Sequence, residues 1–500
     1  MKTANKKIIK VFACVLSFIL AMLPMSSAFA LEAPIANKDE QSVRMTFAAW
    51  GDPQVSNYLT SREKNLILAA EDLKKAQSKI NALVIAGDIT EDCLENEWEY
   101  VYNDISQIGV ENYILATGNH DIRNSSYSTS LKRFTENANR LNASVGSPIS
   151  IDKMNYSCTV NGYKFIVLGS DRKEFEEAFI SNAQLKWLDS QLKASTKDGK
   201  PVFVIAHQSL KYTHGLPNTW GGGSNETAGN IGAQSDDIKD ILNRYQNVIF
   251  ISGHLHTGFG KYSYEKIGNF HSVNLPSVGI KNEDTDYSEP ALGYMVEVYD
   301  DSVVFRARDF GNGCYLENYD INIKLSKIKS VKLSKTTFTY DGKTKTPTVK
   351  LTDLNGKTVP SKYYTVTYPK NRKNIGKYNV KIKFKGKYSS YPQLTAVFNI
   401  APKGTSLTKI KAGKSSFTVS WKKQSSKTSG YQLEYSKSSK FTDSVTVTVS
   451  SAKSVSKTVK KLQAKKKYYV RVRTFKNVKV GRDTVKVYSS WSKVKSVKTK

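Results

Sequence analysis

The sequence predicts a layered α/β unit followed by two all-β sandwich modules, and two observations carry this prediction. Between Met45 and Ser252, short and continuously apolar runs alternate with helical patterns. Such runs are typical of strands that are covered on both faces, as in layered α/β folds. After about Lys324 the helical patterns stop, and short stretches of alternating Thr, Val, Tyr, Lys and Ser follow, which is typical of β-sandwiches.

Apolar runs and helix-start signals define the expected elements of the α/β unit. A helix is predicted from Thr60 to Ile80, with a capping box at Thr60 and Glu63 and one apolar stripe. A second capping box, formed by Ser181 and Gln184, predicts the start of another helix. The predicted strands are Met45–Ala49, Ala82–Ala86, Tyr113–Thr117, Phe165–Gly169, Val202–Ala206 and Val248–Ile251.

The β-rich region divides near Pro402 into two modules, predicted at residues 326–402 and 403–500. In the second module, Trp421 follows an alternating strand and Tyr468 lies six residues after Leu462. This arrangement resembles a fibronectin type III domain with its tyrosine corner at Tyr468. The first module resembles a bacterial immunoglobulin-like surface repeat, on the segments 364–368, 374–376 and 398–400.

The N-terminal segment is typical of a secretory signal peptide. Four lysines among the first ten residues precede an almost wholly apolar run from Val11 to Met25, and small residues surround a cleavage point near Ala30. The run is shorter than the roughly 20 residues that a bilayer requires, which argues against a transmembrane helix. We therefore expect residues 1–30 to be removed and the protein to be secreted, with no transmembrane segment. Three cysteines remain, which permits at most one internal disulfide.

Charge is unevenly distributed along the chain. Residues 331–500 hold 41 Lys and Arg against 5 Asp and Glu, whereas residues 1–330 hold 34 against 39 and contain all six histidines. This uneven distribution predicts that residues 1–330 carry out the reaction and that residues 331–500 attach the protein to a surface. We expect the basic modules to bind an anionic surface, such as the wall polymers of a Gram-positive cell, although a merely solvated face is the simpler alternative. Nucleic acid is disfavoured because the region lacks a recognition helix or an aromatic platform.

Polar groups suited to metal chemistry follow directly after five of the predicted strands. Because ligands gather at the carboxyl ends of strands in open α/β sheets, we expect these groups to meet at one rim. One Gly-Asp block alone is usually a turn, so only the whole set of blocks indicates a metal site. Carboxylate, amide and imidazole ligands suit Mn, Fe or Zn. The blocks are Gly51-Asp52-Pro53-Gln54, Gly87-Asp88, Gly118-Asn119-His120-Asp121, Ala206-His207 and Gly253-His254-Leu255-His256.

This ordered set resembles the calcineurin-like metallophosphoesterase superfamily, which includes purple acid phosphatases and cyclic-nucleotide phosphodiesterases. The resemblance covers residues 43–313 and implies a four-layer αββα sandwich that binds two divalent or trivalent metal ions. It implies that a bridging hydroxide attacks phosphorus while His120 protonates the leaving alkoxide, with Asp121 orienting the His120 ring. It further implies that one metal is held by Asp52, Asp88 and His256, and the other by Asp88, Asn119, His207 and His254.

Gln54 departs from the family pattern, which usually has histidine at this position. An amide oxygen is a weaker ligand than imidazole. The metal that Gln54 helps to hold is therefore expected to bind more loosely, or to be a harder ion such as Mn²⁺.

Other polar residues of the α/β unit have simpler explanations. His271 lies in a strand-like pattern and is expected to be structural. His214 precedes a glycine-rich stretch with Trp220, and a plain surface loop is favoured there over a wall of the substrate pocket. Glu91 and Asp171 are candidates for supporting the site, with surface or helix-capping roles equally open.

The leading functional hypothesis is a secreted phosphoesterase that hydrolyses phosphate mono- or diesters and stays at an anionic cell surface. One alternative is an extracellular protein phosphatase. The other is a non-catalytic surface adhesion or binding protein on the same scaffold, which would require the loss of more ligands. Substrate specificity is expected to lie in two loops, 123–150 and 212–236.

Overall fold

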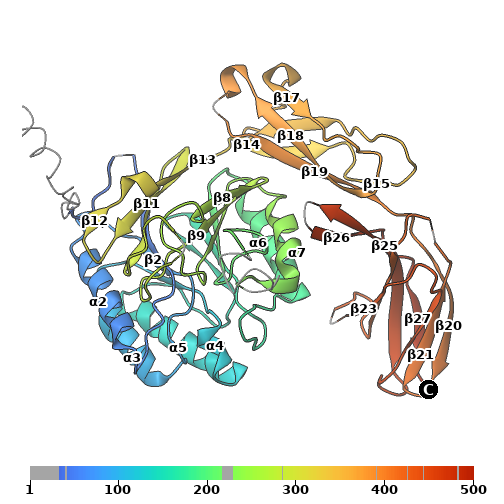
Figure 1. The fold of residues 1–500 in the computed structure, drawn as a ribbon, viewed down its shortest axis with the longest axis horizontal. Helices are drawn as coiled ribbons and strands as arrows, with labels where there is room; N and C mark the ends of the chain where they lie inside the picture. The colour runs from blue at the N-terminus through green and yellow to red at the C-terminus, as the bar shows by residue number, and fades with distance from the viewer. Residues whose placement is uncertain are drawn as a thin grey trace, which may run out of the picture.

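The structure is a computed structural model and describes residues 33–39, 42–216, 229–283, 285–389, 391–424, 426–442, 444–480 and 483–500. The expected signal peptide, residues 1–30, lies outside these residues, and so does Trp220. Figure 1 shows an α/β domain, coloured blue to yellow, followed by two all-β modules in orange and red. Within the described ranges, no helix is long and apolar enough to cross a membrane.

One sheet of the α/β domain joins the first three strands of the chain to four later ones. The strand β1 runs parallel to β2, and β2 runs parallel to β3, while β10 pairs antiparallel with the other side of β1. The sheet order is β12-β11-β10-β1-β2-β3, with β13 also on β11. The strands are β1 (Met45–Trp50), β2 (Ala82–Ile85), β3 (Tyr113–Leu115), β10 (Leu292–Val298), β11 (Ser302–Asp309), β12 (Cys314–Tyr315) and β13 (Ile321–Lys324).

The second sheet has the order β4-β5-β6-β7-β9-β8. Its four inner strands are parallel, and β4 and β8 are antiparallel edges. The strands are β4 (Tyr156–Val160), β5 (Tyr163–Val167), β6 (Val202–Ile205), β7 (Val248–Ser252), β8 (Tyr264–Ile267) and β9 (Phe270–Asn274). All six strands predicted for this domain are present, with ends shifted by about two residues or less.

Alternation along β6 shows how the two sheets stack. Phe203 faces the other sheet, where its ring centroid lies 5.0 Å from that of Phe47 on β1. Its neighbour Val204 faces the opposite way and packs in a separate cluster with Leu188 of α6 (Asn182–Ser195). Because side chains alternate between faces, a strand with both faces apolar is covered on both sides.

Helices complete the outer layers. The first sheet carries α2, α3 and α5, and the second carries α6 and α7, so the predicted four-layer αββα arrangement is confirmed. The helices are α2 (Thr60–Lys74), α3 (Glu95–Ile105), α4 (His120–Arg123), α5 (Tyr127–Ser144), α6 (Asn182–Ser195) and α7 (Ser235–Leu242).

Several helix predictions need correction. The prediction of a capping box at Thr60 is wrong, because Thr60 is already helical and Leu59 occupies the N-cap position. The backbone N–H of Leu59 donates to Ser56 Oγ at 3.2 Å. The helix ends at Lys74, well before Ile80. At α6 the cap is present, since Ser181 Oγ accepts from the Gln184 backbone N–H at 3.2 Å. The segment 123–150, expected to be a specificity loop, contains the whole of α5.

The last third of the chain consists of two β-sandwich modules. The first has the sheets β14-β16 and β15-β19-β18-β17, and the second has the sheets β20-β21-β24 and β23-β22-β25-β26, with β27 on β25. The first set of strands is β14 (Ile328–Leu333), β15 (Thr337–Thr339), β16 (Val349–Asp353), β17 (Tyr364–Thr367), β18 (Gly376–Phe384) and β19 (Leu394–Ala401). The second set is β20 (Leu407–Gly413), β21 (Ser416–Trp421), β22 (Gly430–Ser436), β23 (Val445–Val449), β24 (Ser456–Val459), β25 (Lys467–Val480), β26 (Asp483–Tyr488) and β27 (Lys495–Lys498).

The core of the last module has the expected aromatic centre. Trp421 packs on Tyr431 with ring centroids 5.2 Å apart. The hydroxyl of Tyr468 accepts a hydrogen bond from the Gln463 backbone N–H at 3.2 Å, which is the predicted tyrosine corner.

The first β module contacts the α/β domain directly. Asn269 exchanges two hydrogen bonds with the backbone of Thr395, at 2.6 and 2.7 Å. Lys377 on β18 forms an ion pair with Asp240 on α7. The described cysteines Cys93, Cys158 and Cys314 are free thiols, so none of the described elements is held by a disulfide.

Candidate metal centre

The two sheets meet at one rim, where the predicted residues come together. Asp52, Asp88 and Asn119 follow β1, β2 and β3 of the first sheet. His207 and His254 follow β6 and β7 of the second sheet. A hydrogen bond across the sheets fixes this junction, because His207 Nδ1 lies 2.8 Å from the backbone carbonyl of Ala86, just after β2.

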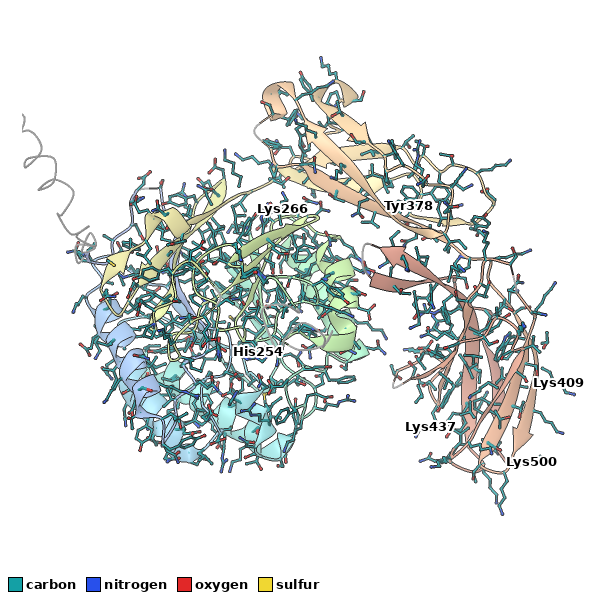
Figure 2. The ribbon with its side chains drawn as sticks, viewed as in Figure 1. His254, Lys266, Tyr378, Lys409, Lys437 and Lys500 are labelled. Carbon is teal, nitrogen blue, oxygen red and sulfur yellow. The ribbon has the colours of Figure 1, made fainter. Side chains whose placement is uncertain are left out.

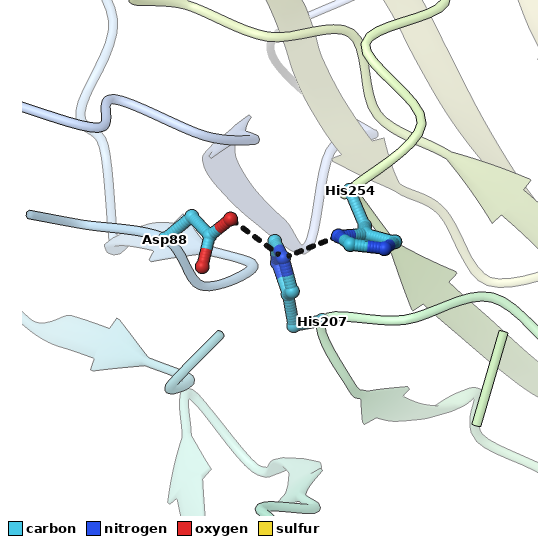
Figure 3. Close-up of side chains that lie close together, drawn as sticks. All are labelled: Asp88, His207 and His254. Atoms are coloured by element: carbon cyan, nitrogen blue, oxygen red, sulfur yellow. Dashed lines mark hydrogen bonds and ion pairs between the residues drawn. The ribbon is translucent and has the colours of Figure 1, made fainter. Parts of the chain in front are cut away.

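Asp88, His207 and His254 form the centre of the cluster, and Figure 3 shows their side chains converging. His207 Nε2 lies 3.0 Å from Asp88 Oδ2 and 3.1 Å from His254 Nδ1. The three residues offer ligand atoms within 4.8 Å of one another, and all three are buried. Asn119 joins them, with its Oδ1 3.2 Å from His207 Nε2.

Asp52 and His256 extend the cluster on one side. His256 Nε2 lies 3.2 Å from Asp52 Oδ1, and Asp52 Oδ1 lies 3.9 Å from His207 Nε2. The Asp52 carboxylate also accepts the backbone N–H of His254 at 3.0 and 3.1 Å. Six of the seven predicted metal ligands are therefore linked in one group of contacts.

Gln54, the seventh predicted ligand, makes its contacts with His120 instead. Its Nε2 lies 2.7 Å from Glu91 Oε2 and 2.8 Å from His120 Nε2. Its Oε1 is buried and has no hydrogen-bond partner among the described residues. A buried acceptor without a partner is costly, so this oxygen is available to a cation or to a substrate group.

The local backbone is strained to present these side chains. Five predicted ligands have left-handed φ angles that are unusual for residues with a side chain. They are Asp52 (49°), Gln54 (46°), Asp88 (46°), His254 (72°) and His256 (49°).

Glycines leave room for the ligand carboxylates. A Cβ at Gly118 would lie 2.0 Å from Asp88 Oδ1, and one at Gly253 would lie 2.5 Å from Asp52 Oδ2. Only glycine allows the backbone to approach the carboxylates so closely.

His120, the predicted general acid, is held by Glu91 and Arg123. His120 Nδ1 lies 3.0 Å from the Glu91 carbonyl oxygen and 3.3 Å from Glu91 Oε2, and Arg123 Nη2 lies 2.9 Å from the same ring nitrogen. Glu91 also forms an ion pair with Arg62. Burial opposes the charge on Glu91, but His120 and Arg62 hold its pKa at about 2. Glu91 therefore stands as an anion beside His120.

Asp121 does not orient His120, which corrects the expectation from the family resemblance. Its carboxylate accepts backbone N–H groups of Gly118, Ile89 and Thr90 at 2.9 to 3.2 Å and the Thr90 hydroxyl at 2.9 Å. Burial raises the pKa of Asp121 to about 6. Its role is to fix the turn after β3, while Glu91 contacts the His120 ring.

Glu176 is a site residue that the sequence pattern did not indicate. It lies on the segment after β5, and its carboxylate accepts hydrogen bonds from Asn119 Nδ2 and Arg123 Nη1, both at 3.0 Å. Burial raises its pKa. No spacing rule connects Glu176 to the strand-end blocks, so only the folded chain reveals it. Asp171, the other acidic residue considered, accepts the backbone N–H of Ser181 at 2.8 Å, before α6.

The two remaining histidines stand apart from this cluster. His271 lies within β9, as predicted, and its Nδ1 lies 2.8 Å from the Tyr264 hydroxyl. His214, expected on a surface loop, is completely buried between the Tyr262 carbonyl and the Ser272 hydroxyl, at 2.7 and 2.8 Å. Burial lowers its pKa to about 4, so it is a neutral structural group.

The protonation states of Asp88, His207 and His254 depend strongly on one another. Burial opposes ionisation of Asp88, but the neighbouring imidazoles, His207 foremost, hold its pKa well below the usual range. Burial disfavours protonated His207, yet Asp88 and Asp52 raise its pKa to about 9. Burial and the charge of His207 hold the pKa of His254 well below its usual range. The two carboxylates thus stabilise one positive charge at the position where metal ligands converge.

The donor set fits metal ions. Two buried carboxylates, an amide oxygen and three imidazoles are ligands that Mn, Fe and Zn accept. The close glycine contacts and the buried Gln54 oxygen are further features of a site that receives a cation.

Comparisons with known proteins agree with this geometry. Residues 45–258 match the family model of calcineurin-like phosphoesterases, and residues 401–489 match that of fibronectin type III domains. No curated protein matches the chain.

Three solved structures illustrate the structural similarity. A dimetal phosphatase from Danio rerio is 17% identical, covers 57% of this chain and 100% of its own, and has a TM-score of 0.40. A purple acid phosphatase from yellow lupin seeds is 13% identical over 56% of this chain and 53% of its own, with a TM-score of 0.40. A fibronectin type III domain of human contactin 1 is 20% identical over 23% of this chain and 92% of its own, with a TM-score of 0.17.

The matched segment contains the five strand-end blocks and the cluster that they form. We conclude that the chain carries a calcineurin-like metallophosphoesterase domain, a metal-dependent phosphoester hydrolase, followed by a C-terminal fibronectin type III domain.

Proposed function

We propose that the protein is a secreted phosphoesterase with two metal ions that hydrolyses phosphate mono- or diesters. The observation that carries the proposal is the convergence of buried carboxylate, amide and imidazole groups from five strand ends. Asp52, Asp88 and His256 would hold one ion, and Asp88, Asn119, His207 and His254 the other. Gln54 lies two residues after Asp52, and its buried oxygen is available as a further ligand.

When bound, such ions supply Lewis acidity that neutralises charge on phosphate oxygens and activates water. The residues of the chain supply the rest. His120 is the proton donor to the leaving oxygen, since it lies at the edge of the cluster and its backbone N–H donates to Asp88 Oδ1 at 2.8 Å. Glu91 and Arg123 hold the imidazole in place, and Glu176 holds Asn119.

The test is hydrolysis of bis- and mono-p-nitrophenyl phosphate by the metal-stripped protein after reloading with Mn²⁺, Fe²⁺ or Zn²⁺. We expect turnover that depends on metal and is lost in Asn119→Ala and His207→Ala. His271→Ala is the matched control, because this histidine is buried outside the cluster. A folded protein without turnover under any metal would contradict the proposal and favour the non-catalytic binding protein. The ratio of diester to monoester rates assigns the preferred ester.

The second part of the proposal is retention of the enzyme at an anionic surface by the basic modules. Its support is the charge distribution and the exposure of the lysines. On β18, Lys381 and Lys383 are exposed and alternate with buried Ile382 and Phe384. Lys409 and Lys500 lie at the periphery of the last module (Figure 2).

Sedimentation of the protein with Gram-positive cell walls at low and high salt tests the retention. We expect binding at low salt that weakens steeply as salt rises, because exposed charges are screened. Absence of binding at low salt would refute this part and leave the catalytic proposal unaffected.

A further inference from the structure

The helix α2 has apolar side chains on its outer face as well as on its inner face. Ile67 and Leu68 are 39% and 49% exposed, whereas Leu66, Ala69 and Leu73 are buried in the core of the domain. A surface helix normally has a polar outer face, and a helix that is apolar all round is covered on both sides. Apolar residues on both faces of α2 therefore indicate that its outer face has a partner.

Exposed apolar side chains are concentrated at this helix. Among the described residues, eight large apolar side chains are exposed, and four of them lie between Tyr58 and Leu68. Single exposed apolar residues are ordinary, but neighbouring ones mark interaction surfaces. Figure 1 shows α2 at the edge of the α/β domain, on the side away from both β modules. Neither β module therefore covers this face.

Two residues of opposite charge flank the apolar pair symmetrically. Lys64 lies three positions before Ile67, Glu71 lies three positions after Leu68, and all four side chains are exposed. Residues with this spacing form one stripe along a helix. Glu71 pairs with Lys74 of the same helix at 2.7 Å. Its carboxylate can accept further hydrogen bonds, because it has two oxygens.

We propose that the stripe Lys64, Ile67, Leu68 and Glu71 is a homodimer interface, in which α2 packs antiparallel against α2 of a second copy of the chain. A two-fold axis between Ile67 and Leu68 brings Ile67 of each copy to the partner's Leu68. Lys64 of each copy then faces the partner's Glu71, which gives two equivalent ion pairs. This inference is independent of the proposed phosphoesterase function.

The order of charges along the stripe selects the antiparallel arrangement. In a parallel pair, Lys64 would face the partner's Lys64 and Glu71 the partner's Glu71, and such like-charge contacts are unfavourable. One helix face from each copy makes a small interface, so we expect a dissociation constant in the micromolar range. The apolar pair supplies the attraction, and the charges set the orientation.

Sedimentation velocity of the purified mature protein, from low micromolar to submillimolar concentration, measures the association. We expect a monomer–dimer equilibrium that Leu68→Gln weakens about tenfold, because the apolar contact is lost twice in each dimer. Lys64→Glu and Glu71→Lys should each weaken it by about the same factor, because like charges then face each other. All three substituted side chains are exposed, so the fold should be retained.

Charge exchange distinguishes this pairing from unspecific association. The double variant Lys64→Glu with Glu71→Lys should dimerise like the wild type, because the two ion pairs are restored with reversed sign. An equimolar mixture of the two single variants should also form dimers, since every Glu then faces a Lys. The matched control is Lys186→Glu, which reverses an exposed charge on α6 and should leave the dissociation constant unchanged.

A wild-type protein that stays monomeric at every concentration would overturn the inference. A dimer unaffected by Leu68→Gln would also overturn it, because the contact would then lie elsewhere. If the double variant were as weak as the single ones, the antiparallel pairing would be wrong. A monomer that binds phosphatidylglycerol vesicles, and loses this binding in Leu68→Gln, would assign the face to a membrane instead.

Discussion

A buried ion pair joins α2 to β11 and is expected to contribute strongly to the stability of the catalytic domain. Arg308 is fully buried, and its Nε and Nη2 donate to the two oxygens of Asp72 at 2.6 and 2.8 Å. Nη2 also donates to the Ala33 carbonyl at 2.8 Å, and the guanidinium carbon lies 4.6 Å from the Tyr315 ring centroid. Nη1 is buried and has no hydrogen-bond partner among the described residues.

Asp72→Asn keeps the shape of the side chain and removes its charge. The Arg308 guanidinium would then be a buried cation without a counter-charge, and breaking a buried pair in this way costs roughly 3–5 kcal/mol. For a domain of this size each kcal/mol lowers Tm by about 2–4 °C, so we expect a fall of roughly 6–20 °C. Replacing both partners, as in Asp72→Leu with Arg308→Met, should recover much of the loss, because apolar substitutes for a whole buried pair are often tolerated.

Thermal unfolding followed by circular dichroism measures the effect. The control is Asp300→Asn, because Arg44 binds Asp300 through the same two-point geometry, at 2.9 and 2.7 Å, but both side chains are largely exposed. We expect little change in Tm there, since exposed pairs contribute little. A similar small change in Asp72→Asn would show that the buried pair carries no more weight than the surface pair, and would refute the reasoning.

Three further outcomes are expected. Burial and the nearby Glu63 carboxylate raise the pKa of Asp104 to about 7, so the folded protein holds a proton that the unfolded chain releases and loses stability as pH rises from 4 to 7. Asp104→Asn should therefore stabilise by about 1–2 kcal/mol at pH 8, a value reduced for partial exposure, and not at pH 4, as urea unfolding at the two pH values will show. Mn²⁺ at about 100 times its Kd should stabilise the protein by about 2.7 kcal/mol in thermal-shift assays, and His207→Ala, unlike His271→Ala, should abolish this response. Tyr468→Phe should cost the last module about 1 kcal/mol in urea unfolding through the lost bond from Gln463, and an unchanged midpoint would contradict that role.

Local pattern was sufficient to predict six of the strands of the α/β domain, because a strand buried on both faces is a continuous apolar run. It did not show which strands share a sheet. β10 pairs with β1 across more than two hundred residues, and no local signal encodes that pairing. The helix α5 was missed although Phe134, Ala138 and Leu141 have helical spacing and are buried. The segment 123–150 is instead predicted to be a loop that sets substrate specificity.

The candidate site shows the same division between local and tertiary information. Strand-end blocks such as Gly253-His254 are local, because the turn and the ligand are adjacent in sequence, and they were found. Glu176 was not found, since its relation to Asn119 and Arg123 arises from the path of a loop. The family resemblance implies the wrong role for Asp121, because its side chain turns back to Gly118 and Thr90 instead of contacting the His120 ring.

The uneven charge of the chain also acts within the molecule. The basic first β module meets an acidic helix of the catalytic domain, where Lys377 pairs with Asp240. Burial raises the pKa of Asp237 on the same helix, and Lys377 and Arg473 partly offset the shift. Lys377 is therefore neutralised internally, while exposed lysines at the periphery, such as Lys409 and Lys500, remain available to an external polyanion. High salt screens both the internal Lys377–Asp240 pair and the contacts of the peripheral lysines with a polyanion. A loss of cell-wall binding at high salt therefore does not show which contacts matter. Binding of a Lys377→Ser variant at low salt removes only the internal pair. If that variant still sediments with cell walls, binding depends on the peripheral lysines, such as Lys409 and Lys500, and not on the face of the first β module that contacts α7.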